Sequence, residues 1–348
     1  MSAIKPSQDL DEIGPEQRLF APKRLEVSQE RRLLARVLLL ATLVVLMGGA
    51  VNVIVDPLYR WRTGLLAPFE GEDGIKGYAL DHRVPVETVV IGNSRALAID
   101  PEHMSKATRW RSFNAAASLS SWKDQIHTAD TAIRRSPQRV RHVVWVLTPE
   151  SMSRQPREGA SKLLDDLHDT FSLGELKATA KSVAPRLGIS YHPNLLYTYD
   201  EGTGRQTRVR TVVGWFDRGD AEARRRVRAF LEPGLITSWA SSVADASIRA
   251  DVEKAISGWS RRGISTVIVI PPYQPLVYHL GGNEFNDMAA ELGIWAATLE
   301  TRGVASVVDV SHIESFSGAP NEFLDGVHLR GANVRKLTDS VVRALRAL

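Results

Sequence analysis

The stretch Glu87-Thr88-Val89-Val90-Ile91-Gly92-Asn93-Ser94-Arg95 decides the fold that we predict for this chain. Its apolar, β-branched run Thr88–Ile91 is typical of a buried strand. Gly-Asn-Ser-Arg follows the run, and a segment compatible with a helix comes next. A strand that ends in this way presents the hydroxyl of Ser94 at the edge of a sheet. Free backbone N–H groups at the start of the helix would surround that hydroxyl.

From Val86 onward, short apolar runs alternate with amphipathic stretches. Strands that are apolar throughout and alternate with helices indicate a parallel sheet covered on both faces. We therefore predict a three-layer α/β/α domain over residues 86–348, with a five-stranded parallel sheet of the flavodoxin-like kind. The expected strands are Thr88–Ile91, Trp110–Phe113, Val143–Leu147, Thr266–Ile270 and Ser306–Val310, and the expected helices are Ser120–Arg135, Val243–Arg262, Phe285–Arg302 and Ala332–Leu348.

The interval between the third and fourth expected strands is too long for a simple crossover. We predict that residues 151–242 form a lobe inserted after strand three, at the functional edge of the sheet. Within it, Leu163–Ala184 and Asp217–Phe230 look helical. Between these two, Tyr191–Trp215 is rich in aromatic and β-branched residues around a Gly202–Gly204 turn.

Before the domain, Val37–Val55 is almost entirely apolar. At about 1.5 Å per residue a helix over this stretch covers roughly 28 Å, close to the hydrocarbon thickness of a bilayer. Lys and Arg concentrate on its amino-terminal side, which places the N-terminus inside. We predict a flexible cytoplasmic tail (1–32), a single transmembrane anchor (33–56), an irregular juxtamembrane linker (57–85) and a periplasmic or extracellular domain.

Two alternatives to this anchor stay open at the level of the sequence. A signal peptide is usually shorter and starts nearer the N-terminus, although Gly48-Gly49-Ala50 offers small residues for cleavage. A helix in the core of a soluble protein would usually show a polar face, which this stretch does not have.

Composition excludes several classes of function. The 348 residues include no cysteine, which rules out disulfides, thiolate catalysis and Cys-ligated metals. The formal net charge is only +4, and clusters such as Arg224-Arg225-Arg226 are typical of a solvated helix face, so we expect no nucleic-acid partner. A metal site at Asp165, Asp166, His168 and Asp169 is a weaker interpretation than an acidic helix surface, and we expect neither a metal nor a cofactor.

The chemistry centres on Ser94 and on the stretch Asp325-Gly326-Val327-His328 near the C-terminus. A serine hydroxyl needs a base to accept its proton before it becomes a useful nucleophile. Asp325 and His328 follow the last expected strand, so one tight loop gives both a base and a carboxylate that orients it. We predict that Ser94, His328 and Asp325 form one catalytic site.

Simpler interpretations exist for each residue. Ser94 alone could be a helix N-cap, and His328 alone could be a structural histidine. The serine arrangement of α/β-hydrolases does not fit, because it requires Gly-x-Ser-x-Gly and the residue two after Ser94 is Ala96.

Ser94 behind the first strand, with Asp-x-x-His shortly before a C-terminal helix, resembles the SGNH (GDSL-like) hydrolase superfamily. Together with an anchor that runs into Val51-Asn52-Val53-Ile54-Val55-Asp56-Pro57, the pattern looks closest to the membrane-anchored branch of polysaccharide O-acetylation and D-alanyl teichoic-acid transfer proteins. The resemblance covers residues from about 50 to the C-terminus. It implies that Ser94 is the nucleophile, His328 the base and Asp325 the residue that orients the base.

The chain departs from that family in two places. The glycine that supplies a backbone N–H after strand two is missing from Phe113-Asn114-Ala115-Ala116-Ala117-Ser118-Leu119, where Leu119 is the nearest match. The Gly-x-Asn-Asp block after strand three is replaced by Leu147-Thr148-Pro149-Glu150-Ser151. We name Asn93, Arg95, Asn114, Leu119 and Glu150 as candidates for oxyanion or substrate contacts. Arg95 could face an anionic group or pair with a carboxylate, and Pro271–Pro275 could form a wall of the substrate groove.

The expected function is acyl transfer at an ester, most simply an acetyl ester of an envelope polysaccharide, through an acyl-Ser94 intermediate. The expected partners are the bilayer, through residues 37–55, the polysaccharide or another acyl ester, and an integral-membrane acyltransferase. An esterase for small esters or lipids, and a non-catalytic module that binds glycan or a partner protein, are the alternatives.

Overall fold

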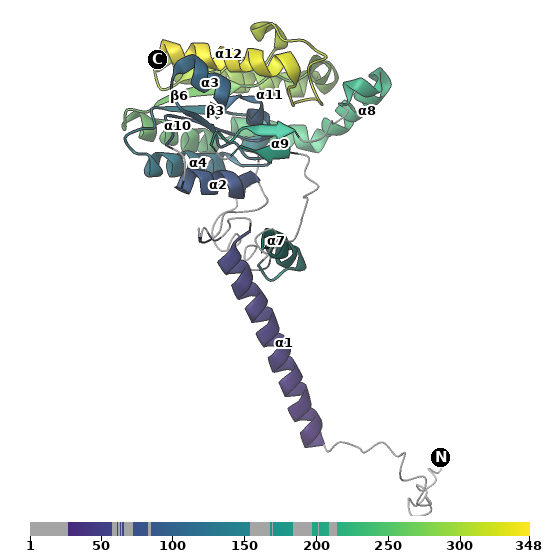
Figure 1. Cartoon of the computed structure of the whole chain (residues 1–348). Helices are drawn as coiled ribbons and strands as arrows, with labels where there is room; N and C mark the ends of the chain where they lie inside the picture. The colour runs from purple at the N-terminus through teal and green to yellow at the C-terminus, as the bar shows by residue number, and fades with distance from the viewer. Residues whose placement is uncertain are drawn as a thin grey trace, which may run out of the picture. The chain divides into compact units, whose positions relative to one another are not determined.

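The computed structural model describes residues 27–57, 61, 63, 65, 72–82, 85–153, 168, 170–183, 197–200, 202–208 and 214–348 (Figure 1). The chain divides into two units, Met1–Ala50 and Val51–Leu348. Residues 1–26 of the expected tail (1–32) lie outside the described residues. Much of the expected linker and of the expected insert also lies outside them.

The second unit is built on a parallel sheet in the strand order β2-β1-β3-β6-β7, the order of flavodoxin-like folds. Its strands are β1 (Thr88–Gly92), β2 (Ser112–Asn114), β3 (His142–Val146), β6 (Ser265–Ile270) and β7 (Ser306–Asp309). All four neighbouring pairs are parallel. The predicted three-layer α/β fold is therefore confirmed.

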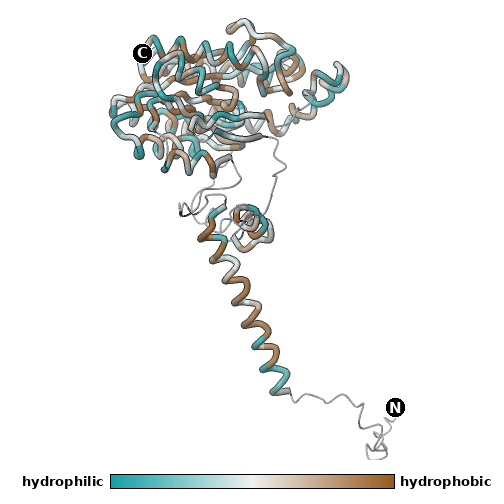
Figure 2. The backbone as a smooth tube through the Cα atoms, viewed as in Figure 1, coloured by the Kyte–Doolittle hydropathy of each residue, from teal (hydrophilic) through white to brown (hydrophobic). Residues whose placement is uncertain are grey.

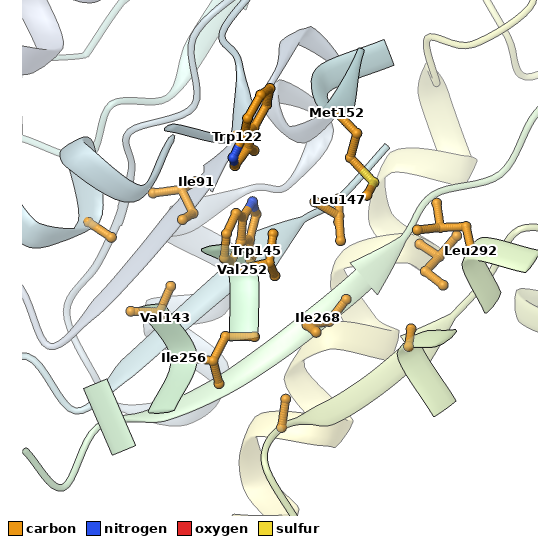
Figure 3. Packing of buried hydrophobic residues seen from close by; sticks show 14 of the residues in the cluster. Ile91, Trp122, Val143, Trp145, Leu147, Met152, Val252, Ile256, Ile268 and Leu292 are labelled. Carbon is orange, nitrogen blue, oxygen red and sulfur yellow. The ribbon is translucent and has the colours of Figure 1, made fainter. Parts of the chain in front are cut away.

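Alternate residues of each strand enter two separate cores, one on each face of the sheet. Val143 and Trp145 of β3 pack into the core shown in Figure 3, with Ile91 and Ile268 of the neighbouring strands. Val144 and Val146 pack into the other core. Both faces are apolar because both are covered by helices, which explains the uninterrupted apolar runs of the sequence.

The helices on the first face are α2 (Glu72–His82), α4 (Trp122–Arg135), α10 (Ala246–Ser260) and α11 (Pro275–Thr301), and those on the second are α3 (Pro101–Thr108) and α12 (Gly331–Ala347). Helix α4 starts at a capping box, in which Ser121 and Asp124 satisfy each other's backbone N–H groups. The helix expected over Val243–Arg262 corresponds to α10, while Val243 and Ala244 end a preceding helix, α9 (Pro233–Ala244). The carboxylate of Asp245 caps α10, so the chain breaks there.

Helix α2 corrects the expectation of an irregular linker. Its glycines suggested a loop, since each costs about 1 kcal/mol in a helix relative to alanine. Ala79 and Leu80 of this helix are buried against the sheet. Nζ of Lys76 donates a hydrogen bond of 2.6 Å to the carbonyl of Ala116. These tertiary contacts outweigh the low helix propensity.

The described parts of the insert are α5 (Pro149–Met152), α7 (Leu173–Val183), the hairpin β4 (Tyr197–Tyr199) and β5 (Gln206–Arg208), the 3₁₀ turn Phe216–Arg218, α8 (Asp220–Phe230) and α9. The hairpin lies against the free edge of β2, where the Asn114 N–H donates to the carbonyl of Thr203 at 2.8 Å. A Cβ at Gly204 would meet the Asn114 carbonyl oxygen at 2.2 Å, so only glycine fits at this contact.

The apolar stretch near the N-terminus forms the helix α1 (Val27–Val55), which begins six residues before the expected anchor. It is long and apolar enough to cross a membrane, and Figure 2 shows the hydrophobic residues along most of its length. Its apolar side chains are largely exposed. This exposure disagrees with a buried core helix. A signal sequence near an N-terminus can pass the same test of length and apolar composition, so that alternative stays open.

Candidate active site

Three side chains from distant parts of the chain meet at the carboxyl edge of the sheet. Nε2 of His328 lies 2.8 Å from Oγ of Ser94, and Nδ1 of His328 lies 2.7 Å from Oδ2 of Asp325. Because an ionised carboxylate only accepts hydrogen bonds, Nδ1 carries the proton and Nε2 is free to accept the proton of the Ser94 hydroxyl. This is the relation between nucleophile, base and orienting carboxylate that acyl transfer requires.

The loop that carries the base is held by its own backbone. Oδ1 of Asp325 accepts hydrogen bonds from the N–H groups of Val327 and His328, both at 2.8 Å. The Leu324 N–H donates to the carbonyl of His328, which closes the loop. Asp325 therefore fixes both the backbone and the imidazole of His328.

Electrostatics keep the Asp325 carboxylate charged. Burial alone would raise its pKa. The hydrogen bond from His328 and the backbone N–H groups outweigh burial, and the pKa of Asp325 falls below its ordinary value. The group that orients the base is thus an anion, the form that accepts the Nδ1 proton in a hydrogen bond.

Ser94 owes its position to the turn that leaves β1. A Cβ at Gly92 would lie 2.6 Å from Cβ of Ala96 and 2.9 Å from the Val146 carbonyl, and φ of Gly92 is +152°. Oδ1 of Asn93 accepts from the Arg95 N–H at 3.1 Å, while its Nδ2 donates to Oγ1 of Thr148 at 2.7 Å. Asn93 therefore positions the serine turn against the end of β3, and its side chain is buried in these hydrogen bonds.

Two backbone N–H groups at this edge have no hydrogen-bond partner within the described part of the chain, those of Ser94 and Leu119. Leu119 has φ +66°, in the left-handed region that favours glycine. Ala117 N–H and the Ser120 hydroxyl both donate to the Gly92 carbonyl, so the turn of Leu119 lies beside the end of β1. The leucine retains the backbone conformation of a glycine.

One predicted contact, Asn114, and one residue that was not predicted, Thr148, are occupied by structural hydrogen bonds. Both amide hydrogens of Asn114 already form hydrogen bonds, since Nδ2 donates to the carbonyls of Ala96 and Ile99 at 2.9 Å. Asn114 is also fully buried, so it does not serve as a substrate contact. Thr148 belongs to the stretch Leu147–Ser151 that replaces the family's Gly-x-Asn-Asp block, and it is buried and hydrogen-bonded to Asn93 and Ser151.

Arg95 pairs with a carboxylate, which decides the question that the sequence left open. Its buried guanidinium lies 3.4 Å from Oε1 of Glu150 and donates to the carbonyls of Pro271 and Pro272 at 2.9 and 2.8 Å. It also lies 3.9 Å from the centre of the Tyr273 ring. The Tyr273 hydroxyl donates to Glu150 at 2.9 Å. The Arg95 side chain thus joins the turns after β1, β3 and β6 and is not exposed to a substrate.

The buried network shifts two pKa values upward. Burial opposes the charge of Arg95, but Tyr273 and Glu150 outweigh it, and the pKa of Arg95 is raised. Burial first, and then the Glu150 charge, hold the pKa of Tyr273 well above its usual range. Both groups keep the protons that form their hydrogen bonds over the ordinary pH range.

Sequence reasoning missed the part of the insert that supports the base. Trp215 N–H donates to the Leu324 carbonyl at 2.7 Å, and Arg330 forms a two-bond pair with Asp217. The Gln274 N–H donates to the Gly326 carbonyl at 3.0 Å, so the Pro271–Pro275 loop supports the same turn. Arg330 and Asp217 are 113 positions apart and have no motif of their own, so only the folded chain reveals the pair.

For the weaker metal interpretation, Asp165, Asp166 and Asp169 lie outside the described residues, and His168 is exposed. Among the residues that the structure describes, no cluster of three or more metal-ligating side chains is present.

No family model and no curated protein matches the chain. Among solved structures it is similar to a Bacteroides fragilis protein described as a proposed acylhydrolase, with 10% identity and a TM-score of 0.38 over 83% of this chain and 94% of that one. At that identity and score the likeness carries no argument about function.

Proposed function

We propose that this chain is a serine acylesterase or acyltransferase of the SGNH type, with Ser94 as nucleophile, His328 as base and Asp325 as the carboxylate that orients the base. The observation that supports this most directly is the 2.8 Å approach of His328 Nε2 to Ser94 Oγ, with Asp325 on the other ring nitrogen. A structural histidine would satisfy its ring without meeting a serine at the end of the first strand.

In the proposed reaction, Nε2 of His328 takes the Ser94 proton while Oγ attacks the carbonyl carbon of an ester. The unpaired N–H groups of Ser94 and Leu119 stabilise the negative oxygen of the tetrahedral intermediate. His328 then gives the proton to the alkoxide as the ester bond breaks. The alkoxide leaves as an alcohol, and the acyl group remains bound to Oγ of Ser94. A water molecule or a sugar hydroxyl, deprotonated by His328, accepts the acyl group and regenerates the serine.

The setting of the domain supports an envelope substrate. Helix α1 is long and apolar enough for an anchor, and Lys/Arg bias in the sequence places the domain on the outer side. We therefore propose a membrane-bound protein that handles acetyl or related esters of an envelope glycan and receives its acyl group from an integral-membrane acyltransferase. Residues 37–55 would lie in the bilayer.

Labelling with a fluorophosphonate tests whether Ser94 is a nucleophile. The full-length protein in detergent is expected to take up one label, and Ser94→Ala is expected to take up none. Equal labelling of both proteins would contradict the role of Ser94. No labelling of either would favour a non-catalytic binding module.

Acetate release distinguishes an esterase from a transferase. A transferase is expected to consume an acetyl donor faster when a glycan acceptor is added, with acetyl groups recovered on the glycan. An esterase releases acetate at the same rate with or without the acceptor. Ser94→Ala is the control for spontaneous hydrolysis in both assays.

A further inference from the structure

A cavity in the described part of the chain lies away from Ser94. It has a volume of about 730 Å³ and lies where β1 and β2 begin, whereas Ser94 follows the end of β1. Its lining comes from α3, from the segments that lead into β1, β2 and β3, and from the Gly202–Thr203 turn of the β4–β5 hairpin. Since β1 has five residues at about 3.3 Å each, roughly 17 Å of strand separates this cavity from the proposed active site.

Four basic side chains line this cavity, and we call them the basic groove: Lys106, Arg109, Arg111 and Arg139. All four are exposed, and none has a side-chain ion pair or hydrogen bond among the described residues. Uncompensated cations that share one concave surface raise the local concentration of anions.

The two acidic residues of the same lining offset only part of this charge. Glu102 is already paired with Arg205 of the hairpin at 2.8 Å. Oε2 of Glu87 accepts the backbone N–H of Arg111 at 2.9 Å, which holds its carboxylate beside the main chain. The groove therefore keeps a net positive charge.

An aromatic ring lies among these cations. Trp110 is half-buried in the lining, and its ring stacks on the imidazole of His142 with centroids 4.1 Å apart. His142 is buried, and neither of its ring nitrogens has a hydrogen-bond partner. Because burial and the nearby Arg141 lower the pKa of His142, the imidazole is neutral and does not compete for anions. The groove thus offers one aromatic ring, stacked on His142, and four exposed cations.

We propose that the basic groove binds an anionic polysaccharide, with carboxylate or similar groups of successive sugars against the four cations and one sugar ring against Trp110. This inference deepens the proposed function, because it rests on a glycan substrate and assigns to it a negative charge. A polynucleotide fits less well, since non-specific nucleic-acid grooves stack successive bases on several aromatic rings, and Trp110 is the one aromatic residue among the described residues of this lining. The groove would hold the polymer while another part of it reaches Ser94.

Binding can be measured without any acyl transfer. The full-length protein carrying Ser94→Ala, in neutral detergent, is titrated with a fluorescent oligogalacturonate and followed by anisotropy. The same oligosaccharide with its carboxylates methyl-esterified is the uncharged control. We expect the acidic form to bind at least tenfold more tightly, and its affinity to fall as salt is raised.

The variant that tests the site is Arg109→Gln with Arg111→Gln, which removes two charges from exposed side chains. Its matched control is Arg261→Gln with Arg262→Gln, two exposed arginines that line a different cavity together with Asp130 and Asp251. We expect at least a tenfold loss of affinity in the first double variant and less than a twofold change in the second. Unchanged thermal melting would show that neither variant alters the fold.

Three results would overturn the inference: equal binding of the acidic and esterified oligosaccharides, equal losses in the two double variants, or tighter binding of a single-stranded polynucleotide than of the oligogalacturonate. Each of them is independent of the nucleophile, since all proteins in the titration carry Ser94→Ala. Failure of the fluorophosphonate labelling would contradict the role of Ser94 but not binding in the basic groove. Failure of the titration would contradict binding in the basic groove but not the role of Ser94.

Discussion

Arg330 donates two parallel hydrogen bonds to the carboxylate of Asp217, Nη1 to Oδ2 and Nη2 to Oδ1, both at 2.6 Å. Arg330 stands two residues after His328, while Asp217 belongs to the insert between β3 and β6. The Gly214 N–H also donates to Asp217, at 2.9 Å. The insert therefore holds the loop that carries the base, in a planar geometry that arginine forms and lysine does not.

The first prediction concerns this pair. Asp217→Asn keeps the shape of the side chain and removes its charge, so the loop of His328 should be held less firmly. We expect fluorophosphonate labelling of Ser94 to slow severalfold, with the protein still folded. Asp220→Asn, which removes a carboxylate paired with Arg224 on the same segment, is the control and should label at the wild-type rate. A similar loss in both variants would show that the Asp217–Arg330 pair has no special role.

The same pair predicts a dependence of stability on acid. The hydrogen bonds from Arg330, and then that from Gly214, lower the pKa of Asp217 from 3.8 to about 2. A carboxyl group with a lowered pKa in the folded state stabilises the fold above its unfolded pKa, and this contribution is lost as the pH falls through the folded pKa. The melting temperatures of the wild type and Asp217→Asn should therefore differ at pH 6 and converge between about pH 4 and pH 2. A difference that stays constant down to pH 2 would refute this assignment.

The third prediction tests the orientation of the base. In Asp325→Asn the amide can present an N–H to Nδ1 and favour the wrong tautomer of His328, which leaves Nε2 unable to accept the Ser94 proton. Loss of this orientation in serine hydrolases reduces turnover by up to about ten-thousandfold, and we expect a labelling rate at least about a hundredfold lower here. A second His–Asp pair provides the control, since His103 Nε2 lies 2.6 Å from Asp339 Oδ1 outside the site. Asp339→Asn should leave labelling unchanged.

The sequence predicted the sheet well because each strand is buried on both faces. Thr88–Ile91 and Val143–Leu147 read as apolar runs for that reason, and the observed strands begin and end within two residues of the predicted ones. The meeting of Ser94 with the Asp325–His328 loop was also foreseeable, since both follow strands of one parallel sheet and so lie at its carboxyl edge.

The predictions that were wrong, or that the sequence left open, concern contacts between distant segments of the chain. Helix α2 was read as linker because glycine propensity is local, whereas the burial of Leu80 is not. Asn114 was selected as a substrate contact for its chemistry, but its amide bonds the carbonyls of Ala96 and Ile99. The role of Arg95 could not be chosen in advance because its partners include main-chain carbonyls of Pro271 and Pro272, which no residue type reveals.

The fourth prediction uses the backbone of Leu119. A left-handed φ costs a side-chain-bearing residue roughly 1 kcal/mol, and glycine avoids that cost but is more flexible when unfolded. We expect Leu119→Gly to be labelled at the wild-type rate, and its free energy of unfolding to lie within about 1 kcal/mol of the wild-type value. Leu119→Pro removes the N–H and forces φ to a negative value, so labelling should fall about a hundredfold. Arg109, whose φ is +65°, provides the control. Arg109→Gly should change the free energy of unfolding by no more than Leu119→Gly does, and it should leave the labelling rate unchanged. Equal labelling of the glycine and proline variants at position 119 would remove this N–H from the proposed oxyanion site.

The last prediction concerns the buried guanidinium beside the nucleophile. Arg95 reaches Glu150 and two carbonyls at once and packs over Tyr273, contacts that the single ammonium group of a lysine cannot reproduce. Arg95→Lys should leave at least one buried carbonyl without a donor, at a cost of about 1–3 kcal/mol in the free energy of unfolding. Because the turn of Ser94 begins this network, labelling should also slow, and the slowing should persist well below the melting temperature. Arg224→Lys changes an exposed arginine with one partner on its own helix and should change neither property. Wild-type stability in Arg95→Lys would mean that the buried contacts do not hold the serine turn in place.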